Sequence, residues 1–368
     1  MKIKQIYIKN HKIFKNFVLD LTDNGKALNL IVIAGINGSG KTTLFRDFIY
    51  RTFQNEVMLK KSYIEVEYIE KQQRKTFKID FESLRVHNYK GLIKYRKAKK
   101  SKYVCASLYH KFKDVVYYEA GYSEHQSAKK IIVQFIDKLI YEEDKKSSEA
   151  YLITQNILNQ FFNDFDLQIE FKGIDRNREP LFRNNVSEKI KMEELSSGEQ
   201  ELITKAFSIY LADIKDSIIL IDEPESSLHP KWQARIVQIY QKIADRKNNQ
   251  IIFATHSPHI VSSVRKEQIR ILVKEDNAIR VIEQFNGSYG WKVDRVLLEI
   301  FRTDGLRTPE IEKKLSELKN MIFNDQYETD TFKNLESELE INIGFDDSDL
   351  ALIRMEVAKR RKMKNEKH

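Results

Sequence analysis

The chain has 368 residues, with 63 Lys or Arg against 54 Asp or Glu and a net charge of +9. Its apolar fraction, 41%, is ordinary for a globular protein and excludes wholesale disorder, and its longest apolar runs are far too short to cross a bilayer. The single cysteine, Cys105, excludes an internal disulfide and a multi-cysteine metal site. The first residues alternate as in a strand rather than a signal peptide, so we expect a cytoplasmic protein with no membrane partner.

The amino-terminal third predicts mainly strands. Residues 1–34 contain two or three of them, over KIKQIYI, NFVLDL and the buried-type run LNLIVIA. A glycine-rich turn follows, and TTLFRDFIYRTF continues as a helix. Residues 63–82 alternate around a polar break and predict a β-hairpin, and VVYY predicts a further strand. Two helical patterns then predict a helical insertion over about 122–165.

A basic segment lies between that hairpin and the insertion. Residues 85–113 hold ten Lys or Arg and no acid, with aromatic residues interleaved among the charges. Cations bind phosphates and aromatic rings stack on bases, so contact with DNA or RNA is one interpretation. A solvated insertion is the other, and the sequence leaves both open.

The second half alternates helix and short apolar strand. The pattern predicts helices at 198–214 and 230–246 and strands at 218–221 and 251–254, which build a mainly parallel sheet flanked by helices. From about 292 the apolar residues mark two amphipathic helices, the first starting at Thr308-Pro309. We therefore predict an α/β head over 1–290 and a helical C-terminal region over 291–368.

A complete phosphate-loop pattern, G-x-x-x-x-G-K-[ST], occupies residues 35–42. It stands between a predicted buried strand and a predicted helix, as the motif requires. The glycines let successive backbone N–H groups point at the β- and γ-phosphates, and the helix N-terminus favours negative charge. We expect Lys41 to hold phosphate oxygens and the Thr42 hydroxyl to ligate Mg²⁺. The expected nucleotide-binding residues here are Gly35, Asn37, Gly38, Ser39, Gly40, Lys41, Thr42 and Thr43.

A second motif ends a buried-type strand, Ser217-Ile-Ile-Leu-Ile, with Asp222 and Glu223. Ligands of open α/β sheets collect at the carboxyl ends of strands, where an Asp can hold Mg²⁺ directly or through water. Glu223 is placed to orient or deprotonate an attacking water. On its own, an apolar run followed by Asp-Glu is weak evidence for a nucleotide site. It becomes strong evidence when it follows a true phosphate loop in the same chain. We predict Thr42 and Asp222 as metal ligands.

Two shorter motifs flank that strand. Leu-Ser196-Ser197-Gly198-Glu-Gln opens a predicted helix and offers free N–H groups to an anion, although taken alone it predicts a plain capping box. Thr255-His256-Ser-Pro ends a buried-type strand. A lone histidine there is more often structural, but after this series of motifs His256 is placed to sense a γ-phosphate.

In this order and spacing, the four motifs resemble the ATP-binding heads of the ABC superfamily. That resemblance implies ATP and Mg²⁺ as ligands and two heads packed head to tail. It implies that Ser196, Ser197 and Gly198 contact the γ-phosphate of ATP bound to the partner copy. It also implies Glu223 as catalytic base and His256 as switch histidine. The glutamine that touches Mg²⁺ in that family has no assigned position here, since Gln54 and Gln126 are poor candidates.

The branch of the family follows from the residues after Glu223. Glu-Pro-Glu followed by Leu228-His229-Pro230 resembles soluble RecF, OLD and Septu-type ATPases rather than transporter heads. SMC-type heads are interrupted by long coiled coils. Here only about 150 residues, without a heptad pattern, separate the phosphate loop from the later motifs. Asp347-Ser-Asp349 offers a D-x-D, but its surroundings favour a helix cap over a nuclease. Arg307-Thr-Pro-Glu310 and the paired helices resemble Septu-type and retron-associated defence ATPases.

The resemblance to these defence ATPases implies an ATPase that forms a homodimer or higher homo-oligomer and gates an antiphage effector, expected to be a separately encoded nuclease. A RecF-like repair ATPase that acts on DNA is the leading alternative. A nucleotide-gated scaffold with slow turnover is a third, from a different functional class.

Overall fold

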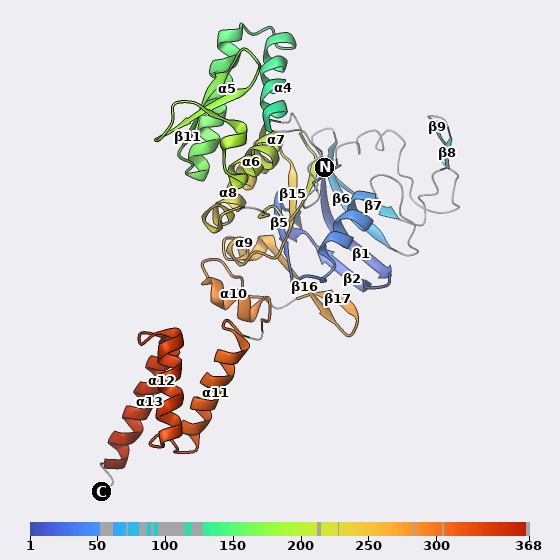
Figure 1. The fold of residues 1–368 in the computed structure, drawn as a ribbon. Helices are drawn as coiled ribbons and strands as arrows, with labels where there is room; N and C mark the ends of the chain where they lie inside the picture. Colours follow the sequence, from blue (N-terminus) through green and yellow to red (C-terminus); the bar gives the residue numbers. More distant parts are fainter. Residues whose placement is uncertain are drawn as a thin grey trace. The chain divides into compact units, whose positions relative to one another are not determined.

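The computed structural model describes residues 1–51, 62–70, 73–80, 87–89, 92–94, 115–118, 128–211, 215–226, 228–282, 285–303 and 305–365. Within them the chain divides into two compact units, Met1–Val296 and Leu297–His368. Figure 1 shows the fold, coloured along the sequence.

A mainly parallel sheet forms the centre of the first unit. Its described strands lie in the order β10-β14-β15-β5-β16-β17, and all neighbours are parallel except the last pair. The strands span Val115–Tyr118 (β10), Ile218–Asp222 (β14), Gln250–Thr255 (β15), Leu30–Ala34 (β5), Ile269–Glu275 (β16) and Ala278–Val281 (β17). β5, β14 and β15 are buried throughout, which explains their nearly unbroken apolar sequences.

Helices cover both faces of this sheet. Strand alternation sends Ile252 and Ala254 of β15 to one face, where they join the cluster that includes the helix after the phosphate loop. Phe253 faces the other side, where its ring meets Tyr240 at a centroid distance of 4.8 Å. The helices concerned are α1 (Lys41–Thr43) with its π-helical continuation η1 (Leu44–Tyr50), and α8 (Pro230–Arg246).

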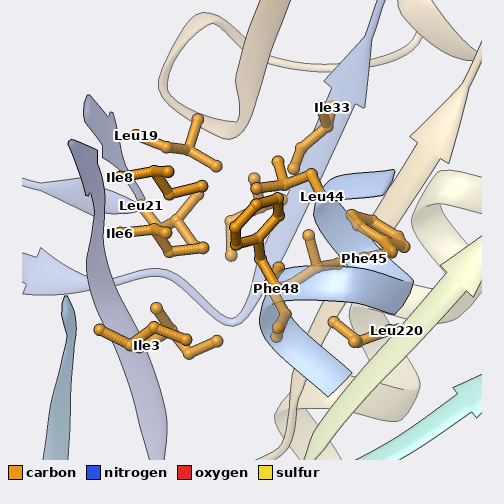
Figure 2. Packing of buried hydrophobic residues seen from close by; sticks show 14 of the residues in the cluster. Ile3, Ile6, Ile8, Leu19, Leu21, Ile33, Leu44, Phe45, Phe48 and Leu220 are labelled. Atoms are coloured by element: carbon orange, nitrogen blue, oxygen red, sulfur yellow. The ribbon is translucent and has the colours of Figure 1, made fainter. Parts of the chain in front are cut away.

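An antiparallel lobe, with its strands in the order β2-β1-β6-β7, packs on η1, the helix that follows the phosphate loop. It comprises β1 (Lys2–Asn10), β2 (Lys15–Asp20), β6 (Tyr63–Glu70) and β7 (Gln73–Asp80). Figure 2 shows Leu44 and Phe48 between Ile6 and Leu19 of this lobe on one side and the parallel sheet on the other. The segment that carries the phosphate loop is thus held between two sheets.

A helical insertion follows β10. Its helices α4 (Ala128–Tyr141) and α5 (Ser147–Phe165) lie side by side, and a three-stranded sheet packs against α5 (Figure 1). That sheet, formed by β11 (Ile169–Ile174), β12 (Pro180–Asn184) and β13 (Ile190–Lys191), was not predicted from the sequence. Neither was the hairpin of β16 and β17.

The remaining elements are short. They are β3 (Thr22–Asp23), β4 (Lys26–Ala27), β8 (His87–Tyr89), β9 (Leu92–Lys94), η3 (Met192–Glu194), α6 (Ser197–Leu202), η4 (Ile203–Phe207), α7 (Ser208–Leu211), α9 (Pro258–Val261), η5 (Lys266–Gln268) and α10 (Val293–Glu299). The elements α6, η4 and α7 are consecutive and together form the helix predicted from residue 198.

The second unit contains α11 (Pro309–Phe323), α12 (Asp330–Ile343) and α13 (Ser348–Asn365) around a core of its own. Asp347 Oδ1 accepts hydrogen bonds from the backbone N–H groups of Asp349 and Leu350, and Arg307 pairs with both carboxylates. The D-x-D pair is therefore a helix cap, as expected. The predicted α/β class, with a parallel sheet, an antiparallel lobe and helical additions, is confirmed.

Candidate functional site

The phosphate loop lies between β5 and α1, and its glycines are sterically required. Gly38 and Gly40 have φ of +79° and +82°, a left-handed conformation that side chains oppose. A Cβ on Gly35 would lie 2.5 Å from Ser39 Oγ and 2.6 Å from the Leu272 carbonyl oxygen. Ser39 is buried at the centre of the loop, whereas Asn37 is exposed at its tip and Thr43 is half-buried. The sequence motif is thus built as a tight turn.

Lys41 is buried against this loop. Its Nζ donates to the carbonyl oxygens of Gly35 at 2.7 Å and Ile36 at 3.0 Å. Burial lowers the pKa of the Lys41 ammonium, while the carboxylates of Asp222, Glu223 and Glu225 act in the opposite direction. The ammonium is therefore held against the phosphate loop.

The two predicted metal ligands meet although 180 residues separate them in sequence. Thr42 Oγ1 donates to Asp222 Oδ2 at 2.7 Å, at the carboxyl end of β14. Hydroxyl and carboxylate oxygens are ligands that Mg²⁺ prefers, alongside substrate phosphates and water. No group of three or more metal-binding side chains occurs among the described residues. The pair fits a magnesium ion that is completed by nucleotide and water.

Glu223 and His256 are also brought together. The pairing of β14 with β15 sets Asp222 opposite Ala254, so the residues that follow each strand are neighbours. His256 Nδ1 lies 3.1 Å from Glu223 Oε1. Glu223 adopts φ of +50°, and its backbone N–H donates to the Ala254 carbonyl oxygen at 2.8 Å. A non-glycine residue in this conformation is strained, which is common at functional sites.

The serine-glycine motif caps α6. Ser196 Oγ accepts from the Glu199 N–H, and the Glu199 carboxylate accepts from the Ser196 N–H at 2.8 Å. The capping box that this sequence predicts is therefore formed. Next to it lies a cavity of about 650 Å³. Its lining residues are Asp166, Leu167, Gln168, Ser196, Gly198, Glu199, Leu228, His229, Lys231 and Trp232.

This lining contains no residue of 35–42, all of which the structure describes. The structure thus joins Lys41, Thr42 and Asp222 to Glu223 and His256, but it places Ser196 and Gly198 at a separate cavity. Ser197 is exposed at the first turn of α6.

The basic segment 85–113 falls outside the described residues except for the backbone of β8 and β9. Gln54 and Gln126, neither of which was assigned as the Mg²⁺-contacting glutamine, also fall outside them. One residue near the site was missed by sequence reasoning. Glu225 is buried, and its side chain accepts hydrogen bonds from Thr255 at the end of β15 and from His256 directly after it. Because these residues are distant in sequence, the contact becomes visible only once the strands are paired.

Comparison with known proteins gives a family. Residues 30–262 match the family model described as "AAA domain, putative AbiEii toxin, Type IV TA system". The chain belongs to this AAA-domain family. The matched region extends from β5 to α9 and includes all the residues described above from the phosphate loop to His256.

Individual relatives match shorter stretches. "Retron Ec83 probable ATPase" from Escherichia coli is 29% identical over an alignment of 212 residues, gaps included, that covers 52% of this chain and 36% of that protein. Septu protein PtuA from Bacillus thuringiensis is 35% identical over an alignment of 127 residues, gaps included, that covers 31% of this chain and 32% of that protein. The chain thus matches only about a third of the length of these curated relatives.

Among solved structures, an SMC head domain from Thermotoga maritima shares 17% identity and covers 77% of this chain and 100% of its own, with a TM-score of 0.48. This score is too low to support an argument about function. In the part of the chain that the structure describes, no helix combines the length and apolar character needed to span a membrane.

Proposed function

We propose that the chain hydrolyses ATP with Mg²⁺. The observation that carries this proposal is the convergence of Lys41, the Thr42–Asp222 pair and the Glu223–His256 pair on one complete phosphate loop. Phosphoryl transfer depends mostly on positioning and on electrostatic stabilisation of the phosphate oxygens. These residues supply a cation, two oxygen ligands and a carboxylate next to a histidine.

In the proposed reaction, Lys41 and the loop N–H groups hold the β- and γ-phosphates. Water attacks the γ-phosphorus atom, the bond to the β–γ bridging oxygen breaks, and ADP leaves with that electron pair. Glu223 accepts the proton of the attacking water, and His256 orients this carboxylate and contacts the γ-phosphate. Thr42 and Asp222 would hold Mg²⁺, which when bound would neutralise charge on the phosphate oxygens.

We further propose that the site is completed by a second copy packed head to tail. The cavity beside α6 exposes a helix N-terminus, which attracts anions, together with Ser196 and Gly198. Its separation from the chain's own phosphate loop supports the assignment of Ser196, Ser197 and Gly198 to the ATP of the partner copy.

At the level of the cell, we propose that nucleotide binding and hydrolysis gate an antiphage effector that another gene encodes, expected to be a nuclease. The similarity to a retron ATPase and a Septu protein supports this role over DNA repair. The genes next to this one would separate the two, since a defence system encodes its effector nearby. The rate of ATP hydrolysis would separate the defence and repair roles from a nucleotide-gated scaffold, which turns over slowly.

The test is phosphate release from ATP by the parent and two variants. Glu223→Gln should still bind ATP but hydrolyse it about 100- to 10,000-fold more slowly, since it loses a general base. Lys41→Ala should weaken nucleotide binding roughly 10- to 100-fold, because a charge-assisted hydrogen-bond donor is lost. Chelation of Mg²⁺ should stop turnover. Glu143→Gln, at an exposed position of the insertion, is the control.

Near-parental hydrolysis by Glu223→Gln would remove Glu223 from the proposed reaction. A parent that binds ATP but releases no phosphate would favour the scaffold.

We also propose nucleic acid as a partner, on the basis of the ten Lys or Arg without any acid in 85–113. Released counterions should make the affinity fall steeply with salt. Replacing Lys97, Lys99, Lys100 and Lys102 with Glu should abolish binding in a filter assay with DNA or RNA. Absence of binding at low salt, or binding that survives these changes, would leave the solvated-insertion interpretation.

A further inference from the structure

Glu225 is a buried carboxyl group that the proposed reaction does not use. It lies in the turn after β14, and its side chain is 5% exposed. Its Oε1 accepts two hydrogen bonds from the end of β15, from Thr255 Oγ1 at 2.6 Å and from the His256 backbone N–H at 3.0 Å. One oxygen atom thus joins the two loops that carry Glu223 and His256.

The second oxygen of Glu225 has a different environment. Oε2 is buried and has no hydrogen-bond partner among the described residues. Burial accordingly raises the pKa of the Glu225 carboxyl. A buried polar atom without a partner costs free energy that an apolar side chain would avoid. Fold stability therefore does not by itself call for a carboxyl group at this position.

The hydrogen bonds of Oε1 reach the chain directly next to the His256 ring. They hold the Thr255 hydroxyl and the N–H of the Thr255–His256 peptide, and His256 Nδ1 lies 3.1 Å from Glu223 Oε1 and 3.7 Å from Glu225 Oε1. The imidazole is therefore next to the carboxylate that should activate water. The His256 side chain is itself 44% exposed, so burial alone does not hold it there.

The next residue, Ser257, donates its backbone N–H to Thr255 Oγ1 at 3.0 Å, but its side chain has hydrogen bonds that do not involve Glu225. Ser257 Oγ donates to Gln233 Oε1 at 2.6 Å and accepts from the Ile260 N–H at 3.2 Å, which caps α9. Gln233 Nε2 in turn donates to the Leu228 carbonyl oxygen at 2.8 Å. Because α9 keeps this support without Glu225, loss of the Glu225 side chain should release His256 without unfolding the segment that follows it.

We propose that Glu225 is a positioning residue that holds His256 against Glu223 by bonding the end of β15 to the loop after β14. The proposal rests on the proposed ATP hydrolysis. Its requirement is one acceptor oxygen at the position of Oε1. An amide oxygen can supply this acceptor, so Gln should replace Glu, whereas Ala should not.

The experiment compares Glu225→Ala, Glu225→Gln and the control Glu143→Gln in the full-length chain. Glu225→Ala should lower kcat about 10- to 100-fold, as expected when a catalytic group is misplaced by about 1 Å. Its affinity for ATP, measured with a fluorescent nucleotide, should stay within about twofold of the parent, because the phosphate loop is intact. Glu225→Gln should recover most of the parental kcat.

Thr255→Val provides a second variant if Glu225→Ala does not fold. It removes one donor to Oε1, together with the acceptor of the Ser257 N–H, while keeping the side-chain shape. It should lower kcat by a smaller factor than Glu225→Ala does. Combined with Glu225→Gln, it should lower kcat no further than Thr255→Val alone.

Parental kcat in Glu225→Ala would overturn the positioning role, and so would equal losses in Glu225→Ala and Glu225→Gln. Failure of the proposed function has a different signature, since the parent itself would then release no phosphate from ATP.

Discussion

The phosphate loop and the serine-glycine motif each lead into the start of a helix, but they are built differently. The loop ends in Lys41 and Thr42, which contact loop carbonyls and Asp222, and the helix behind it is packed between two sheets. The motif at Ser196 is closed only by its own capping box and faces a cavity that holds no phosphate-loop residue. This difference is what the proposed head-to-tail site requires, with the phosphate loop of one copy and the serine-glycine motif of the other on the same ATP.

The largest expected effect comes from Gly198→Asp, which separates the two halves. An Asp there puts bulk and negative charge where a partner's γ-phosphate should approach the helix N-terminus. Hydrolysis should fall roughly 1,000-fold, comparable with loss of the general base. Nucleotide binding should stay near the parental affinity, because the phosphate loop is unchanged. Equilibrium binding and phosphate release check this, and lost binding would contradict the separation.

Phe48→Ala should reveal how much the phosphate loop depends on its core. The Phe48 ring is buried beside Leu44 between the two sheets (Figure 2). Its loss should cost about 3–4 kcal/mol in the free energy of unfolding, measured by denaturant titration. Tyr141→Ala, at a side chain that is 75% exposed, is the control. An equal cost for both changes would contradict the packing described.

Ser196→Ala should have a smaller effect on stability. It removes the N-cap of α6 and half of the capping box, which is worth about 1 kcal/mol. The same denaturant titration measures this cost. A cost as large as that of Phe48→Ala would mean that the fold depends on the serine-glycine motif as strongly as on the helix behind the phosphate loop.

The sequence predicts the phosphate loop and its surrounding strands better than it predicts the sheet of the helical insertion or the contacts of Glu225. The glycine pattern, the buried strands β5, β14 and β15, and Asp222 follow from local spacing. β11 to β13 do not, because the pattern is broken by a register shift at Gly173 and by Pro180 at the start of β12. Glu225 could not be found either, since its partners Thr255 and His256 depend on how β14 and β15 pair.

The measurement that tests the central claim most directly mixes two inactive variants, Gly198→Asp and Lys41→Ala. A mixed pair contains one site with both changes and one site with neither. If sites are shared between copies, the mixture should recover part of the parental rate of phosphate release, while each variant alone stays inactive. If Gly198→Asp alone hydrolyses ATP at a near-parental rate, or the mixture remains as inactive as its components, the head-to-tail site is contradicted.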